Sequence, residues 1–232
     1  MRTMMATDFE YTIALTSCNR HNYLKRTLDS FVECVDIPPI HTVIVEDSAT
    51  PRPDWLTYPL LGEITWVQNG TRKGQGYTID RAYAEVRTEY IFHMEDDWAF
   101  VRPGPFIADS HAILERFPEV LTVMLMNPVQ WLVRDERYPF PIYRPSAGGL
   151  NQCYDGLAFA NGLRRLSDYK KLGVPFASFE RGYDLYNMES AIVEIPAGEA
   201  YRKMGYILAA LGVEYTGHFG SESVYLHGRK PA

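Results

Sequence analysis

The sequence has few cysteines and no long hydrophobic run. Only three of its 232 residues are cysteine (Cys18, Cys34 and Cys153), and none has the CxxC spacing of redox and zinc motifs. An odd, widely spaced set implies no disulfide framework, so we expect a reducing compartment, the cytoplasm. Apolar runs such as residues 123–126 are far shorter than the ~20 residues that a membrane-spanning helix needs. Residues 1–10 contain no apolar stretch, so we also expect no signal peptide.

An excess of positive charge is also missing. The formal net charge is −6 at pH 7, which argues against a nucleic-acid-binding surface and against a polybasic membrane anchor. Hydrophobic residues make up 46% of the chain and charged residues 22%, which is ordinary for a packed globular protein and excludes extensive disorder. The length is sufficient for one large α/β domain.

Short apolar segments alternate with amphipathic ones along the first half of the chain. This alternation requires crossover connections and therefore predicts an α/β domain with a mostly parallel central sheet flanked by helices. The second half is less regular, with loops and short strands over residues 127–160. We find no repeat and no linker, and expect a single domain over residues 1–232. The predicted strands are 11–17, 42–45, 64–67, 90–94 and 121–126, and the predicted helices are 22–35, 76–87, one from 103–105 onward, and others near 165–172, 186–194 and 199–211.

Three consecutive acids, Glu95, Asp96 and Asp97, follow the fourth predicted strand and have apolar neighbours on both sides. In open α/β sheets, ligands bind at the carboxyl ends of the strands. Because like charges repel, a compensating cation is expected, and Mg²⁺ or Mn²⁺ prefers such oxygen ligands. Alternation along an extended chain would put Glu95 and Asp97 on one face and Asp96 on the other. We predict Asp97 as the metal ligand, Glu95 near a ribose or a metal-bound water, and Asp96 near the nucleotide or holding the loop. The alternative is a solvated acidic turn.

Polar residues end the first two strands, and a basic, glycine-rich loop follows the third. Residues 16–20 open a helix, where free backbone N–H groups can bind a base or a phosphate. Glu46 and Asp47 end the second strand, where a carboxylate could accept hydrogen bonds from a uracil or a ribose. Ordinary caps and turns favour the same residue types. Residues 69–76, NGTRKGQG, suit a nucleotide but match neither a Walker A loop nor GxGxxG.

Taken together, these motifs resemble the nucleotide-binding half of GT-A fold glycosyltransferases, particularly the family 2-like group. TSCNR, VEDSA, NGTRKGQG and EDDW follow successive strands, and the resemblance covers about residues 11–101. It implies a Rossmann-like GT-A domain with a nucleotide-sugar half over about 8–126 and an acceptor half over about 127–232. The EDD at 95–97 stands where the family has its DXD metal motif. The positions implied to contact the nucleotide are Thr16, Asn19 or Arg20, Glu46 or Asp47, Lys73, Glu95 and Asp96.

The second half resembles the family more faintly. Residues 186–190 look like the start of the helix that carries the catalytic carboxylate in inverting members, which implies Glu189 as the base, with Asp184 as the alternative. Acids are also favoured at any helix N-terminus by the helix dipole. His218 stands where a late histidine returns to the metal or the diphosphate, with His227 as its competitor, and imidazole is an acceptable ligand for Mn²⁺. Arg164 or Arg165 either meets a phosphate or is a surface charge.

The resemblance implies an enzyme that moves a sugar from a nucleotide diphosphate to a hydroxyl group, with Mn²⁺ or Mg²⁺ as cofactor. The expected donor is a UDP-sugar, with GDP- and dTDP-sugars left open, and inversion is favoured over retention. The acceptor is a saccharide, a glycolipid or a protein, and neither a nucleic-acid partner nor an integral membrane segment is expected.

The alternative is a non-catalytic nucleotide-sugar or glycan-binding module of the same fold. A sugar-nucleotide pyrophosphorylase would need glycines in the first loop, which residues 16–22 lack. A receiver or phosphatase domain would leave the EDD triplet without a role.

Overall fold

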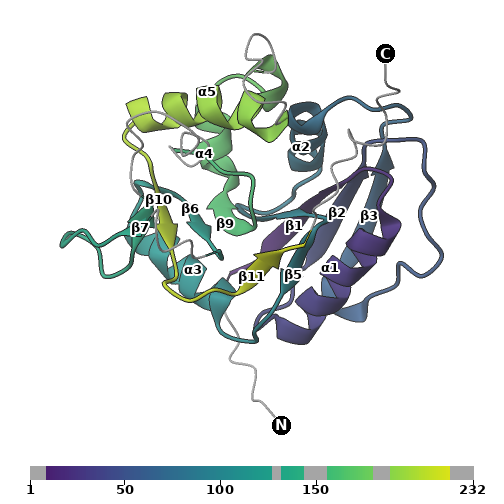
Figure 1. Cartoon of the computed structure of the whole chain (residues 1–232), viewed down its shortest axis with the longest axis horizontal. Helices are drawn as coiled ribbons and strands as arrows, with labels where there is room; N and C mark the ends of the chain where they lie inside the picture. Colours follow the sequence, from purple (N-terminus) through teal and green to yellow (C-terminus); the bar gives the residue numbers. More distant parts are fainter. Residues whose placement is uncertain (1–8, 127–131, 144–155, 180–188, 220–232) are drawn as a thin grey trace.

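The computed structural model describes residues 9–126, 132–143, 156–179 and 189–219 (Figure 1). Among these, a nine-stranded sheet has the order β3-β2-β1-β4-β9-β6-β10-β8-β7. The first four of these strands are apolar segments that the sequence predicts to be strands. The bounds are β1 (Tyr11–Ser17), β2 (His41–Glu46), β3 (Glu63–Gln68), β4 (Tyr90–Glu95), β6 (Val120–Met124), β7 (Leu132–Val133), β8 (Ile142–Tyr143), β9 (Gly162–Arg165) and β10 (Ile207–Ala210).

Most strands of this sheet run in the same direction. The pairs β3/β2, β2/β1, β1/β4 and β6/β10 are parallel, whereas β9 is antiparallel to both β4 and β6, and β8 is antiparallel to β10 and β7. Only β9 and β8 therefore oppose the rest within the described residues. This confirms the predicted mostly parallel α/β sheet, although β9 itself was not predicted.

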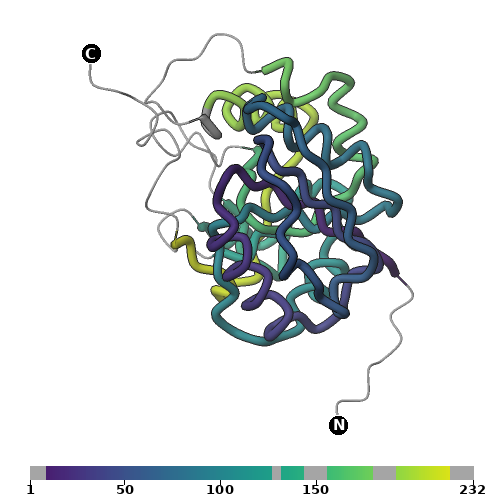
Figure 2. The backbone as a smooth tube through the Cα atoms, turned by 90° about the vertical axis from the view of Figure 1, so that its right-hand side faces the viewer, coloured from purple at the N-terminus to yellow at the C-terminus, as the bar shows by residue number. Residues whose placement is uncertain are grey.

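Helices cover both faces of the sheet. Helices α1 (His21–Cys34) and α3 (Phe106–Arg116) pack on one face, and α2 (Gln75–Ala84), α4 (Leu166–Lys171) and α5 (Glu189–Lys203) lie on the other (Figures 1 and 2). The helical spacing of Leu24, Leu28 and Phe31 puts all three side chains of α1 in the core. None of the helices among the described residues is long and apolar enough to cross a membrane.

The last third of the chain differs from the sequence prediction. Two helices, 186–194 and 199–211, were expected, but one helix, α5, runs from Glu189 to Lys203 with Pro196 inside it, and β10 follows. Gly205 has φ +89°, a left-handed conformation that favours glycine and ends the helix. A four-residue apolar run such as residues 207–210 suits a helix or a buried strand equally well, and parallel pairing with β6 decides for the strand.

A small second sheet brings the end of the described chain to the acid triplet. Strand β5 (Trp98–Phe100) pairs antiparallel with β11 (Thr216–His218), and His218 lies opposite Trp98. Helix α1 holds the start of β5 through its polar residues: the Thr27 hydroxyl donates to the Asp96 carbonyl at 2.7 Å, and Ser30 Oγ accepts from the Phe100 N–H at 3.0 Å. Helix α1 thus holds the backbone within the acid triplet, at Asp96, and after it, at Phe100.

Candidate functional site

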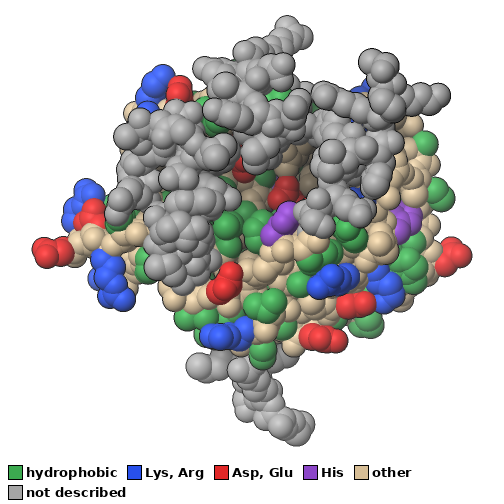
Figure 3. Space-filling view, viewed as in Figure 1, with side chains coloured by type: hydrophobic (Ala, Val, Ile, Leu, Met, Phe, Trp, Pro, Cys, Tyr) green, Lys and Arg blue, Asp and Glu red, His purple; other side chains and the backbone are tan. Residues whose placement is uncertain are grey.

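The predicted site residues meet at the carboxyl edge of the sheet. Strand β4 ends at Glu95, Asp96 and Asp97 form the turn into β5, and β1 and β2 end at Ser17 and Glu46 beside it. Because these strands are parallel, their carboxyl ends share one edge. On this side of the molecule, acidic side chains and a histidine lie next to one another (Figure 3). The edge is where an open α/β sheet places its ligand.

Arg20 bridges two of the three acids. It lies at the N-cap of α1, and its Nε donates to Asp96 Oδ2 at 3.2 Å, its Nη2 to Asp96 Oδ1, and its Nη1 to Asp97 Oδ2 at 3.0 Å. Arg20 was predicted as a possible nucleotide contact. In this structure its guanidinium donates hydrogen bonds to the carboxylates of Asp96 and Asp97. Asp96 is fully buried, whereas the Arg20 side chain is 23% exposed, so the carboxylate is shielded from water and the guanidinium only in part.

Glu95 lies apart from that bridge. Its Oε1 accepts from Gln75 Nε2 at 2.5 Å and its Oε2 from Trp98 Nε1 at 3.1 Å. The predicted grouping of Glu95 with Asp97 on one face stays a prediction, and the charge of Asp97 does act on Glu95. The strand ends at Glu95, and the turn presents Asp96 and Asp97 to the same guanidinium.

The surroundings of the three acids shift their pKa values in different directions. Burial raises the pKa of Asp97, but a hydrogen bond from His218 and the charge of Arg20 outweigh it, so its pKa is lowered overall. Burial raises the pKa of Asp96 to about 7 despite Arg20. Burial, assisted by the charges of Asp97 and Glu194, raises the pKa of Glu95 well above its usual value. The carboxylate that stays ionised most readily is thus Asp97, which suits a metal ligand.

His218 reaches the same oxygen from β11. Its Nε2 lies 3.3 Å from Asp97 Oδ2, and its side chain is about half exposed. The next residue fixes this strand: the Phe219 N–H donates to the Asp97 carbonyl at 3.0 Å, and the Phe219 ring lies 4.0 Å from the Arg26 guanidinium and 5.3 Å from the Tyr23 ring. The structure therefore brings two predicted metal ligands together. The competitor, His227, lies outside the described residues.

Asp97 and His218 fit a divalent cation as two of its ligands. In this structure the 3.3 Å between Asp97 Oδ2 and His218 Nε2 is a hydrogen-bond distance, so the imidazole would give up the proton on Nε2 when it binds a cation such as Mn²⁺. Within the described ranges, no group of three or more His, Cys, Asp or Glu side chains could hold a metal. The remaining ligands would therefore come from water and phosphate oxygens, as Mg²⁺ sites commonly have them.

A second group of polar contacts lies at the ends of β1 and β2. Glu46 is fully buried, and its Oε1 accepts from the Asn19 N–H at 2.8 Å and from Ser48 Oγ at 2.5 Å. Its Oε2 is buried with no hydrogen-bond partner in the part of the chain that the structure describes. Asn19 has φ +56°, the left-handed region that Asn tolerates better than most residues. Thr16, also buried, lies beside Glu95 in the β1/β4 ladder.

Asp47 organises the glycine-rich loop. Its Oδ1 accepts from Asn69 Nδ2 at 2.7 Å and from the Lys73 N–H at 2.8 Å, and its Oδ2 accepts from the Gly74 N–H at 2.9 Å. Lys73 is exposed, and its backbone takes part in holding the loop. Asp47 thus has a structural role in shaping residues 69–74. Its predicted contact with a nucleotide remains a prediction, as does that of Lys73.

The predicted catalytic carboxylates are only partly described. Glu189 is the first residue of α5, but its side chain and the whole of Asp184 lie outside the described residues. The sequence analysis missed Glu194, which is 7% exposed and whose Oε1 accepts from the Phe159 N–H at 2.5 Å. Because the charge of Glu194 raises the pKa of Glu95, it lies near the acid edge. An acid within the apolar run at residues 192–195 was the available signal.

Arg164 and Arg165 are not free surface charges in this structure, and a contact of either with a phosphate stays a prediction. Arg164 is 3% exposed and donates from Nη2 to the Ala158 carbonyl at 3.1 Å. Arg165 forms an ion pair with the buried Asp168 at 2.7 Å and donates to backbone carbonyls. The sequence could not reveal this because residues 162–165 form an interior strand rather than the exposed start of a helix.

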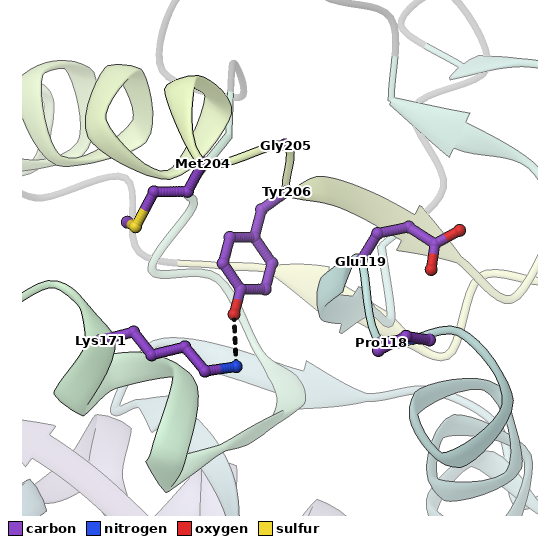
Figure 4. Close-up of a pocket in the computed structure, with 6 residues that line it drawn as sticks. All are labelled: Pro118, Glu119, Lys171, Met204, Gly205 and Tyr206. Carbon is purple, nitrogen blue, oxygen red and sulfur yellow. Dashed lines mark hydrogen bonds between the residues drawn. The ribbon is translucent and has the colours of Figure 1, made fainter.

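A separate hollow of about 540 Å³ lies at the opposite edge of the sheet, by the amino ends of β6 and β10 (Figure 4). Lys171 is the only Lys or Arg in its lining, and its Nζ already donates to Asp168 at 2.8 Å and to the Tyr206 hydroxyl at 3.0 Å. No acid of the EDD turn borders this hollow. Its lining residues are Pro118, Glu119, Lys171, Met204, Gly205 and Tyr206.

The architecture and the similar solved structures show the fold of this chain, which is the GT-A fold. No protein-family model matches the sequence, and no curated protein matches it either. Solved structures with similar folds include S. aureus TarS 1–349 in complex with UDP-GlcNAc, with a TM-score of 0.64 and 14% identity, covering 96% of this chain and 62% of that one. The fold predicted from sequence motifs is confirmed.

Two further structures give the same fold. TarS 1–349 in complex with UDP has a TM-score of 0.60 and 14% identity, covering 88% of this chain and 58% of that one. GalNAc-T7 with UDP, GalNAc and Mn²⁺ has a TM-score of 0.60 and 12% identity, covering 90% of this chain and 43% of that one. The chain spans less than two thirds of the length of each of these proteins.

Proposed function

We propose that this chain is a metal-dependent glycosyltransferase that moves a sugar from a nucleotide diphosphate, a UDP-sugar, to a hydroxyl acceptor. The observation that carries the proposal is the approach of Asp97 Oδ2 and His218 Nε2 to 3.3 Å at the carboxyl edge of a GT-A sheet. The UDP, UDP-GlcNAc and Mn²⁺ named with the similar structures support the donor class and the cation.

In this proposal, Asp97 and His218 bind the cation and orient the donor diphosphate. When bound, the cation supplies positive charge where negative charge develops on the leaving diphosphate. The exposed Lys73 adds to that charge from the loop shaped by Asp47. The residues proposed to line the nucleotide are those at the ends of β1, β2 and β4 and in the following loops, Thr16, Asn19, Glu46, Asp47, Glu95 and Asp96.

Inverting transfer also needs a base that takes the proton of the acceptor hydroxyl. Glu189 remains the first candidate and Asp184 the second. Glu194 joins them because it is a buried carboxylate on α5 whose charge acts on Glu95. The helix that carries the base would then present it toward the acid edge of the sheet.

A thermal-shift panel tests the proposal. UDP, GDP, dTDP and CDP are compared with and without Mn²⁺, together with Mn²⁺-dependent hydrolysis of UDP-sugars. Ligands that bind the native state raise its melting temperature, so UDP with Mn²⁺ should give the largest increase. Asp97→Ala should abolish the Mn²⁺-dependent part of the shift and turnover. Asp29→Ala, which changes a half-exposed acid paired with Lys25, is the matched control.

Each alternative result has a clear reading. UDP binding without any turnover favours a non-catalytic binding module of the same fold. Retention of metal-dependent turnover by Asp97→Ala would show that the cation lies elsewhere. No response to any of the four nucleotides would contradict the proposal as a whole.

A further inference from the structure

The acid turn contains its own counter-charge. Three nitrogen atoms of Arg20 donate to carboxylate oxygens, two of them to Asp96 and one to Asp97. The planar guanidinium presents its N–H groups in a rigid fork, which can fix two carboxylates relative to one another, whereas an ammonium group acts as a point charge. Arg20 is therefore suited to set the direction of the Asp97 carboxylate.

We propose that Arg20 is a positioning residue for the cation site, which acts by orienting Asp97 and not by contacting the nucleotide. The inference rests on the proposed function, because it concerns the same cation. Arg20 Nη1 and His218 Nε2 reach Asp97 Oδ2 at 3.0 and 3.3 Å, so this oxygen is held from two sides. The bridge to the buried Asp96 anchors the guanidinium itself.

The position of Arg20 in the fold supports this role. It is the N-cap residue of α1, and the same helix holds the backbone of the turn through Thr27, whose hydroxyl donates to the Asp96 carbonyl. Helix α1 thus holds the backbone of the turn through Thr27 and its carboxylates through Arg20. Removal of Arg20 would leave Asp96 and Asp97 to repel each other, and Asp97 would no longer be held in its present direction.

The test measures the direct binding of Mn²⁺ to the nucleotide-free protein. The electron paramagnetic resonance signal of free Mn²⁺ reports how much of the cation remains unbound. Arg20→Ala should weaken Mn²⁺ binding about 10- to 100-fold, the loss typical when a residue that orients a metal ligand is removed. Arg20→Lys should recover part of the affinity, because an ammonium can pair with one carboxylate but cannot bridge two. Lys25→Ala, an exposed cation on the same helix, is the matched control and should bind Mn²⁺ as the wild type does.

UDP binding in the presence of EDTA is measured on the same variants and should not change in Arg20→Ala. If Arg20→Ala does not fold because Asp96 loses its buried partner, the double variant Arg20→Ala/Asp96→Asn removes both members of the pair. It should show the same loss of Mn²⁺ affinity, since Asp97 still lacks its anchor.

Three results would overturn the inference. Unchanged Mn²⁺ affinity together with weaker UDP binding would make Arg20 a nucleotide ligand, and tighter Mn²⁺ binding would make it a competitor of the cation. If the wild type transfers sugar but binds no Mn²⁺, the inference and the proposed cation site are both wrong, and the transferase activity itself stands. Conversely, the expected Mn²⁺ pattern without nucleotide binding or transfer would overturn the proposed function alone.

Discussion

Individual carboxylates at the acid edge differ in charge because they differ in neighbours. Asp97 is held by a guanidinium and an imidazole, which lower its pKa against the effect of burial. Glu95 accepts from Gln75 and Trp98, and burial raises its pKa well above the usual value. One acid of the triplet is therefore suited to bind a cation, and Glu95 holds its proton more readily than Asp97 does.

The base assignment can be tested residue by residue. If Glu194 is the base, Glu194→Gln should lower kcat for transfer about 10²- to 10⁴-fold, the range typical of general-base catalysis, with little change in UDP affinity. The comparison is with Glu189→Gln and Asp184→Asn in the same assay, and Glu199→Gln on α5 is the matched control. Full activity of Glu194→Gln would show that Glu194 is not the base and that its role is structural, through the hydrogen bond that it accepts from the Phe159 N–H.

His93 should make folding stability depend on pH. It is fully buried in β4, and burial together with the nearby Arg164 lowers its pKa well below the usual 6.5. The unfolded chain therefore binds a proton that the folded chain does not, and this contribution to stability is complete above pH 6.5 and is lost as pH falls. The loss is at most about 1.4 kcal/mol per pH unit.

Urea unfolding between pH 7.5 and 5 measures this effect. His93→Phe should flatten the pH dependence, whereas Tyr83→Phe, which removes only the hydroxyl that contacts His93 Nδ1, should keep it. Equal slopes for the wild type and His93→Phe would show that other groups cause the pH dependence.

At the scale of elements, α5 meets the loop before β9 at a close backbone approach. A Cβ atom at Gly156 would lie 2.3 Å from the Gly198 carbonyl oxygen of α5, and Gly156 has φ +107°. Gly156→Ala should therefore cost more than the ~1–3 kcal/mol of a strained backbone alone, because α5 must also move. Chemical denaturation measures the free energy of unfolding.

The matched control for this prediction is Gly205→Ala. Gly205 also has a left-handed φ, +89°, but a Cβ atom there would meet nothing within 4 Å. Gly205→Ala should thus show the backbone cost without the clash. If both variants lose the same free energy of unfolding, the loop is packed loosely enough against α5 to accommodate the added methyl group.

The elements of the first half were predictable and several of the second half were not. Strands β1 to β4 and helices α1 to α3 have apolar patterns that local sequence determines, and their bounds agree with the prediction to within about three residues. Strand β9 contains two arginines and a glycine, and only its place between β4 and β6 makes it a strand. The same is true of β10, where tertiary pairing overrides a sequence that also suits a helix.

The candidate site shows the same division. The acids could be selected from the sequence because their motif follows a predicted strand, and His218 because of its position in the family resemblance. The contacts between them could not: the bridge of Arg20 to the acid turn depends on how α1 begins, and the role of Glu194 depends on how α5 packs. Sequence patterns select residues at strand ends, whereas the partners of each side chain follow from tertiary packing.

At the scale of the whole molecule, ligand binding should affect one edge of the sheet and not the other. Hydrogen exchange with UDP and Mn²⁺ should slow in the loops that follow the strands, residues 17–20, 46–48, 69–74 and 95–97. The opposite edge, residues 118–119 and 204–206, should not change and is the internal control. Protection confined to residues 118–119 and 204–206 would move the nucleotide site to the hollow of Figure 4.

Strand β9 has a consequence for the order of events during synthesis. Strands β4 and β6 are each bonded to β9 and not to one another, so the seam between the two parts of the sheet stays open until residues 162–165 have left the ribosome. A nascent chain shorter than this would display two unpaired strand borders, the kind of surface on which chaperones act and aggregates grow. Synthesis of residues 162–165 thus allows β4 and β6 to be joined, whereas the other border of β6 stays unpaired until β10 has been made.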